Sequence, residues 1–114
     1  MIVDCMIILP KKSQTIHWTN HSKMKMRHYR FSESRVLRIL RKPDRVEEGI
    51  APYTLAAMQK SGTKKHPTEA WLMYQIKKSK VTIISAWRFP GITPVGQRPQ
   101  IPQDVLEELG KNLI

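Results

Sequence analysis

The sequence predicts an α+β domain in which two N-terminal helices pack on a four-stranded, mainly antiparallel β-sheet, followed by a short C-terminal helix. Three observations support this class. Apolar residues recur with helical spacing between residues 20 and 42, four short segments rich in β-branched and aromatic residues follow Pro43, and an amphipathic stretch closes the chain. A chain of 114 residues is long enough to bury a single hydrophobic core.

The first helix is expected to begin with Thr19 or Asn20 as its cap and to end at about Tyr29 or Arg30. Two stripes with i, i+4, i+7 spacing run along it: Ser22, Met26 and Tyr29 on the inward side, and His21, Lys25 and His28 beside them. The second stripe flanks the buried side, so its side chains are expected at the edge of a cleft.

The second helix is expected to begin with Ser32 as its cap and to end before Pro43. Its amphipathic pattern places Val36, Leu37, Ile39 and Leu40 on one side and Arg35, Arg38, Arg41 and Lys42 on the other. The arginine side is therefore predicted to face solvent.

Residues 45–50, 53–60, 69–77 and 80–89 are predicted to be strands. The segments between them are an Ala-Pro pair, the run Ser-Gly-Thr-Lys-Lys-His-Pro and a Lys-Ser pair, all typical of turns. Short turns between successive strands indicate an antiparallel meander. Along the last two strands, successive side chains point to opposite sides of the sheet, so one side of each strand is available to pack against the helices.

The two ends of the chain differ in character. Residues 1–9 are apolar but contain Asp4 and precede Lys11 and Lys12, so we expect a first strand or an N-terminal arm rather than a signal peptide. Residues 90–102 contain four prolines and two glycines, too many for a strand, and a short helix is predicted to begin at Gln103 or Asp104. The expected organisation is one core domain at 1–92 and a tail at 93–114.

Charge gives the first indication of a partner. The chain carries a formal net charge of +11, and between residues 17 and 45 only Glu33 and Asp44 oppose nine cations. These cations are Lys23, Lys25, Arg27, Arg30, Arg35, Arg38, Arg41, Lys42 and Arg45. Such a concentration favours a polyanionic partner, and nucleic acid first. Cys5 is the only cysteine, which is typical of a protein of the reducing cytoplasm and excludes an intramolecular disulfide.

Residues 21–46 (HSKMKMRHYRFSESRVLRILRKPDRV) resemble a family of small bacterial domains, domain-of-unknown-function family number 4258. The matching positions are His21, Ser22, Lys25, Met26, Phe31, Ser32, Val36, Leu40 and Pro43, and the run SKVTIISAWR resembles the last strand of that family. The resemblance covers about residues 15–90. The family's usual arginine–glycine pair is replaced here by Tyr29 and Arg30, where a glycine would allow a left-handed turn.

The family is placed by fold similarity with the barnase, EndoU, colicin and RelE group of metal-independent ribonucleases. The resemblance therefore implies a RelE-like or barnase-like fold, RNA as partner, no cofactor, and an acidic antitoxin-like protein that covers the basic cleft. Fold alone does not establish activity.

Metal-independent cleavage of RNA requires a proton acceptor, a proton donor and cations that stabilise the charged transition state. We expect His21 as acid or base, Lys25 one turn away as a phosphate contact, and Arg88 as a bidentate clamp on the scissile phosphate. The residues expected to bind nucleic acid are Lys23, Arg27, Arg30, Arg35, Arg38, Arg41 and Trp87. Each has an ordinary structural alternative: a histidine that satisfies a backbone group, an arginine in a surface ion pair, or a tryptophan in the core.

The leading hypothesis is a small RNA-binding protein with a toxin-like endoribonuclease fold. The alternative is a noncatalytic module of the same fold that binds RNA, ribosomes or a protein. A zinc site is disfavoured although His17 and His21 have HxxxH spacing, because paired cysteines are missing. We expect no membrane attachment, because the cationic helices lack a broad apolar insertion side.

Overall fold

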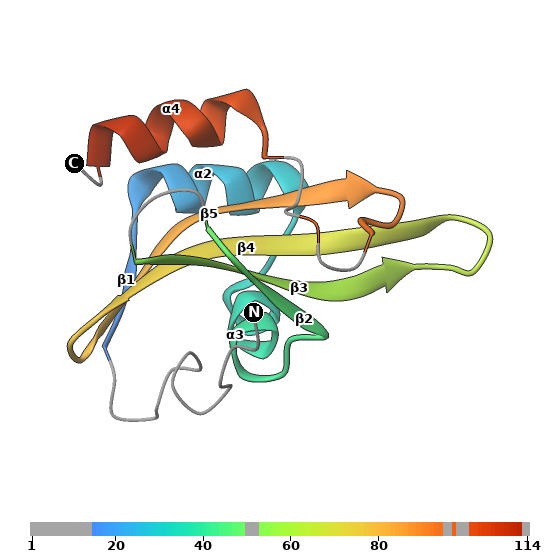
Figure 1. Ribbon diagram of the computed structural model, residues 1–114, viewed down its shortest axis with the longest axis horizontal. Coiled ribbons are helices and arrows are strands. Elements are labelled where there is room, and N and C mark those ends of the chain that lie inside the picture. The colour runs from blue at the N-terminus through green and yellow to red at the C-terminus, as the bar shows by residue number, and fades with distance from the viewer. Residues whose placement is uncertain (1–14, 50–52, 95–96, 98–100, 113–114) are drawn as a thin grey trace.

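A five-stranded mixed sheet forms the centre of the fold, with strand order β1-β5-β4-β3-β2 (Figure 1). The structure, a computed structural model, describes residues 15–49, 53–94, 97 and 101–112. The first strand or arm expected at residues 1–9 lies outside the described residues. The elements, in chain order, are β1 (Thr15–Trp18), α2 (Asn20–Tyr29), α3 (Glu33–Arg41), β2 (Arg45–Glu48), β3 (Thr54–Gly62), β4 (Pro67–Lys77), β5 (Lys80–Pro90) and α4 (Gln103–Asn112).

The prediction of a four-stranded sheet is wrong, because β1 adds a fifth strand that runs parallel to β5, with Thr15 opposite Lys80 and Trp18 opposite Ile83. The other three strand pairs are antiparallel, as expected. This strand has only four residues, which alternate between exposed and half-buried, and its partner is more than sixty residues away. A short edge strand with a distant partner leaves little periodicity in a local window of sequence.

Helix α2 continues along the side of β5 where β1 ends. The Thr19 Oγ1 accepts a hydrogen bond from the Ser22 backbone N–H at 3.0 Å and donates one to the Ile83 carbonyl at 2.8 Å. It therefore caps the helix and ties its first turn to the sheet. A β-bulge lies at the same level, because Met73 pairs with Ser85 whereas Tyr74 pairs with Ile83. A bulge increases the local twist of a strand. Here it lies where the pairing of β5 with β1 ends and α2 begins to pack beside β5.

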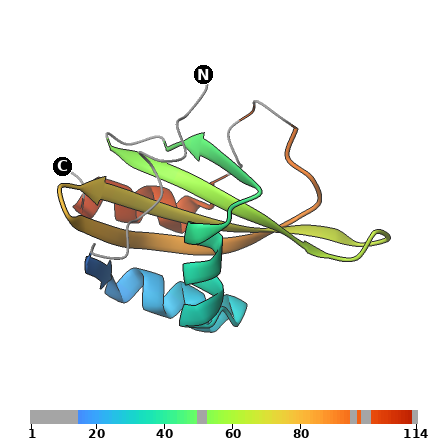
Figure 2. The same ribbon diagram turned by 90° about the horizontal axis from the view of Figure 1, so that it is seen from below.

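The two faces of the sheet carry different helices (Figures 1 and 2). On one face, Val36, Ile39 and Leu40 of α3 belong to the larger core cluster. On the other, Val105 of α4 packs with the cluster that includes the stacked rings of Trp71 and Trp87, 6.3 Å apart. Tyr29 of α2 contacts both clusters, as expected for a residue at the edge of the sheet.

The turn between the two helices is tightly defined. Arg30 adopts a left-handed conformation, with φ 60° and ψ 43°, and the next residue, Phe31, donates its backbone N–H to the Met26 carbonyl at 2.8 Å. Ser32 caps α3 by accepting a hydrogen bond from the Arg35 backbone N–H at 3.0 Å. Phe31 and Val36 flank this cap in the same core cluster, which is the arrangement of a hydrophobic staple. Both predicted caps are therefore confirmed.

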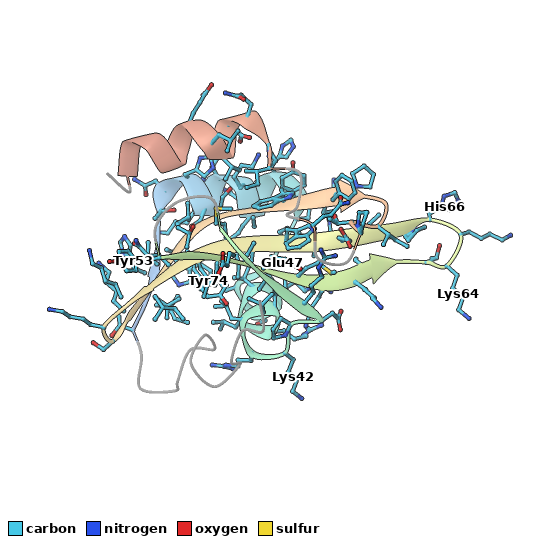
Figure 3. The ribbon with its side chains drawn as sticks, viewed as in Figure 1. Lys42, Glu47, Tyr53, Lys64, His66 and Tyr74 are labelled. Atoms are coloured by element: carbon cyan, nitrogen blue, oxygen red, sulfur yellow. The ribbon has the colours of Figure 1, made fainter. Side chains whose placement is uncertain are left out.

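The hairpin formed by β3 and β4 is longer than expected and projects from the body of the domain (Figure 1). Pairing continues to Gly62 and Pro67, residues that the sequence places in a turn. Gly62 has φ 77°, and a Cβ there would lie 2.3 Å from the His66 carbonyl oxygen. The last paired position of β3 therefore requires glycine. The loop itself is short, and it presents Lys64 and His66 at its tip (Figure 3).

Candidate nucleic-acid interface

Helices α2 and α3, which Figure 2 shows from below, together carry a concentration of exposed cations. Its six exposed cations, which define the α2–α3 face, are Lys23, Arg27, Arg30, Arg38, Arg41 and Lys42. Glu33 is the only carboxylate in the sequence between residues 20 and 42. Among the described residues, none of the six cations forms an ion pair with a carboxylate. Their charge is therefore exposed to solvent and is not neutralised by a carboxylate in the described part of the protein.

Two open hollows lie along this face. One, of about 260 Å³, is lined by Lys23, Met26, Arg27, Phe31 and Glu33. The other, of about 420 Å³, is lined by Ser34, Leu37, Arg38, Arg41 and Lys42. The second combines three cations and a hydroxyl with one apolar side chain and no carboxylate among its described lining residues. Cations around a shallow apolar floor suit a flexible polyanion with a sugar and base attached to each charge.

The candidate catalytic residues His21 and Lys25 lie together, one turn apart on α2, and each is only 9% exposed. The His21 Nε2 lies 3.1 Å from the Ser85 Oγ on β5. The Lys25 Nζ lies 2.6 Å from the Asp104 Oδ2 on α4 and 5.0 Å from the centre of the Tyr29 ring. The expected cleft edge is thus largely covered, and α4 supplies the carboxylate that neutralises Lys25.

The electrostatics of Asp104 follow from this contact. Burial alone would raise the pKa of the Asp104 carboxyl group, but the hydrogen bond and charge of Lys25, together with the charge of His21, outweigh it and lower the pKa. The Asp104 carboxylate is accordingly ionised at neutral pH. A lysine held in this way is less available to a phosphate than the exposed cations of the α2–α3 face.

Arg88 lies at the opposite end of α2 from His21. Its Nε donates to the Tyr29 carbonyl at 3.4 Å, its Nη1 donates to the Ser61 Oγ at 3.4 Å, and its guanidinium stacks 4.4 Å from the centre of the Phe31 ring. Eight residues of helix separate His21 from Tyr29, a rise of about 12 Å. The structure therefore brings His21 to Lys25 but does not bring Arg88 to either of them.

Arg35 differs from the other arginines of its stripe. It is half-buried, and its Nε is buried with no hydrogen-bond partner among the described residues. The pKa of its guanidinium is lowered, and burial is the largest cause. The charges of Arg38 and Arg88 lower this pKa further, whereas the charge of Asp44 raises it.

Trp87, expected to stack on a base, is 1% exposed and packs on Trp71. Its ring is not accessible to a base in this conformation, so we leave it out of the interface. His17 and His28 are exposed, on β1 and α2 respectively. The described residues contain no group of three or more histidine, cysteine or acidic side chains placed to hold a metal ion, and Cys5 lies outside them.

Several partners of the candidate residues could not be found from the sequence. Asp104 is 79 residues from Lys25, and Ser85 is 64 residues from His21. The sequence offers no spacing signal for contacts at such separation, because they depend on how β5 and α4 lie against α2. Ser61, which the sequence places in a turn, and Phe31 likewise contact Arg88 although both are distant from it in the sequence.

Comparison with known proteins adds no relative. No protein-family model, curated protein or solved structure matches the chain. Along the described part of the chain, no helix is both long enough and apolar enough to cross a membrane.

Proposed function

We propose that this protein is a small RNA-binding protein that contacts the phosphate backbone through the α2–α3 face. The observation that carries the proposal is the set of six exposed cations on two adjacent helices, unpaired among the described residues and bordering two hollows. Phosphate contacts supply most of the affinity of such surfaces. The resemblance to the ribonuclease-like domain family favours RNA over DNA.

The test is the affinity for a labelled single-stranded RNA measured over a range of salt concentrations. Each phosphate contact to a single strand contributes about −0.7 to the slope of log affinity against log salt, so six contacts predict a slope of about −4. An affinity that does not change with salt would overturn the proposal, because binding through cations must release counterions.

Metal-independent cleavage is a second candidate, favoured by one observation. The His21 side chain, which can act as a general acid or base, is held 3.1 Å from a buried serine hydroxyl, with Lys25 one turn away. Binding without cleavage has the stronger support, because Lys25 is paired with Asp104 and Arg88 lies at the other end of the helix.

An assay in EDTA separates the two. The wild-type protein, His21→Ala and Arg88→Ala are incubated with the labelled RNA. Cleavage by the wild-type protein that is lost in His21→Ala would support catalysis. Equal background cleavage by all three proteins would exclude it and leave binding as the function.

An acidic protein of the antitoxin type is the natural competitor for the same surface. It would neutralise the cations that RNA contacts, so RNA and this partner are expected to exclude each other. The proposed setting is the bacterial cytoplasm, where the lone cysteine stays reduced. Competition between RNA and an acidic protein from a neighbouring gene would test this arrangement.

A further inference from the structure

We propose that the RNA-binding surface continues from the α2–α3 face onto the projecting hairpin of β3 and β4, where Lys64 and Lys65 contact a more distant part of the same strand. Arg88 joins the two parts of the surface. The inference rests on the proposed function and makes it more specific, because it names a second contact region and predicts that a long single strand uses it and a short one does not.

The hairpin has one side that faces the same way as α3, called here the α3 side. Gln59 on β3 marks it, because the Gln59 Nε2 donates to the Lys42 carbonyl at the end of α3, at 3.0 Å. Ser61 is two residues further along β3 and lies on the same side, as does Thr68, its partner on β4. The hairpin extends beyond α3 (Figures 1 and 2), so this part of the α3 side presents the hydroxyl groups of half-buried residues.

The opposite side of the hairpin contains a carboxylate, but that carboxylate is covered. Lys60 and Glu69 are paired across the two strands, one position away from Ser61 and Thr68. Glu69 is 2% exposed, and its Oε1 accepts hydrogen bonds from the Thr93 hydroxyl at 2.6 Å and from the Thr93 backbone N–H at 3.1 Å. A strand on the α3 side would therefore meet hydroxyl groups and would not meet the Glu69 carboxylate.

Arg88 connects the α3 side of the hairpin to the α2–α3 face by direct contacts. Its Nη1 donates to the Ser61 Oγ at 3.4 Å, and its guanidinium lies 4.4 Å from the centre of the Phe31 ring. Phe31 in turn lines the hollow of about 260 Å³ together with Lys23 and Arg27. The two hydrogen-bond acceptors of Arg88 are a backbone carbonyl and a hydroxyl, both neutral, so its charge remains available to a phosphate.

The tip of the hairpin supplies the distant contact. Lys64 and Lys65 are exposed, and within the described chain neither forms an ion pair with a carboxylate. Figure 3 shows Lys64 extending toward the same side of the sheet as Lys42. The loop is closed by two hydrogen bonds, from the Thr63 N–H to the His66 carbonyl at 3.2 Å and from the His66 N–H to the Thr63 Oγ1 at 3.1 Å. The lysines are therefore carried on a loop of defined shape.

Single-stranded RNA has the chemistry that this surface fits. Its phosphates can contact Arg88 and then the two lysines of the tip, and its 2′-hydroxyl groups can exchange hydrogen bonds with Ser61 and Thr68. Cations separated by neutral hydroxyl groups are complementary to a flexible strand with a regular repeat of negative charge. The occupant of the α3 side is accordingly the same RNA strand that binds the α2–α3 face.

The first experiment measures the affinity of the variant Lys64→Ala with Lys65→Ala for single-stranded RNAs of about 4 and about 16 nucleotides, which bracket the site sizes of single-strand-binding domains. For the longer RNA we expect a loss of about 10-fold, which equals two exposed charge contacts of about 0.7 kcal/mol each. Its slope of log affinity against log salt should become less negative by about 1.4. The shorter RNA binds the α2–α3 face without reaching the tip, so its affinity should change less than about twofold.

The variant Lys77→Ala with Lys80→Ala is the matched control. These two lysines are exposed and paired with each other, and they lie at the end of β4 that is opposite to the tip. The control loses the same net charge. Its affinity for either RNA should fall by less than about twofold, because salt screens charges that do not contact the strand.

The second experiment uses the wild-type protein and so does not depend on a variant. The backbone amide signals of Thr63, Lys64 and Lys65 are followed by NMR while each RNA is titrated. The longer RNA is expected to shift these signals together with those of α2 and α3. The shorter RNA is expected to shift the signals of the two helices and to leave those of the tip unchanged.

The outcomes separate this extension from the broader function. If the wild-type protein binds RNA with steep salt dependence but the tip variant behaves as the control, or loses affinity equally for both lengths, the extension is overturned and RNA binding stands. Tip signals that do not move with the longer RNA also overturn it. Absence of binding to either RNA overturns the proposed function itself. A loss confined to the longer RNA, with shifts at the tip, supports the extended surface.

Discussion

The Lys25 Nζ on α2 lies 2.6 Å from the Asp104 Oδ2 on α4, in a hydrogen-bonded ion pair between helices that are distant in the sequence. The Lys25 side chain is 11% exposed and that of Asp104 is 47% exposed. The contact ties the first turn of α4 to the buried end of the stripe, which holds His21 and Lys25. His28, at the other end of the same stripe, is exposed.

Replacement of Asp104 by Asn should make stability less dependent on pH. The pKa of Asp104 is lowered in the folded protein, so its contribution is complete above its ordinary value of 3.8 and is lost as pH falls through the lower folded value. Since Asp104 is half exposed, we expect a loss of no more than about 1 kcal/mol at pH 7. Urea unfolding at pH 7 and at pH 3 measures it.

Glu107→Gln is the matched control for this pair, because Glu107 is exposed on the same helix. It should change the free energy of unfolding by less than about 0.5 kcal/mol at either pH. A loss in Asp104→Asn that is the same at pH 3 as at pH 7 would show that the ion pair does not contribute to stability.

Thr19→Ala should destabilise the protein by about 1–2 kcal/mol, because it removes both the cap of α2 and the hydrogen bond to the Ile83 carbonyl. Thr19→Ser keeps the oxygen and should stay within about 0.5 kcal/mol of wild type. Chemical unfolding of both variants gives the comparison. Equal losses would indicate that the methyl group, rather than the hydroxyl, accounts for the effect.

Arg30→Gly should stabilise the fold by about 0.5–1 kcal/mol, because Arg30 occupies the left-handed region that glycine adopts without steric cost. Arg30→Ala should bring no such gain, since alanine retains the Cβ. Both variants should weaken RNA binding to the same small extent, because both remove the same exposed cation. Thermal unfolding and RNA titration of the two proteins separate the backbone effect from the charge effect.

The sequence predicts well the features that depend on neighbouring residues. Thr19 and Ser32 cap their helices as expected, and Val36, Ile39 and Leu40 are buried, because caps and helical periodicity act within a few residues. The fifth strand could not be predicted, since the edge strand Thr15–Trp18 depends on a partner at Lys80–Ile83.

The candidate site shows the same division. The exposure of Arg38 and Arg41 follows from helical periodicity, whereas the partial burial of Arg35 on the same stripe depends on tertiary packing that periodicity does not encode. The hypothesis that His21, Lys25 and Arg88 form one site requires Arg88 to approach His21 and Lys25 from the last strand. In the structure Arg88 reaches only the end of α2, and Asp104 from α4 takes the position beside Lys25.

The most direct test of the proposed interface compares two charge reversals of equal size. Arg38→Glu with Arg41→Glu alters the α2–α3 face, and Lys77→Glu with Lys80→Glu makes the same change in net charge at exposed positions of the hairpin between β4 and β5. RNA affinity at one salt concentration is measured for both variants, with circular dichroism to confirm folding. We predict at least about a 30-fold loss for the first variant, roughly 1 kcal/mol for each reversed contact, and a much smaller loss for the second. Equal losses in the two variants would contradict it, because binding would then depend on total charge and not on this surface.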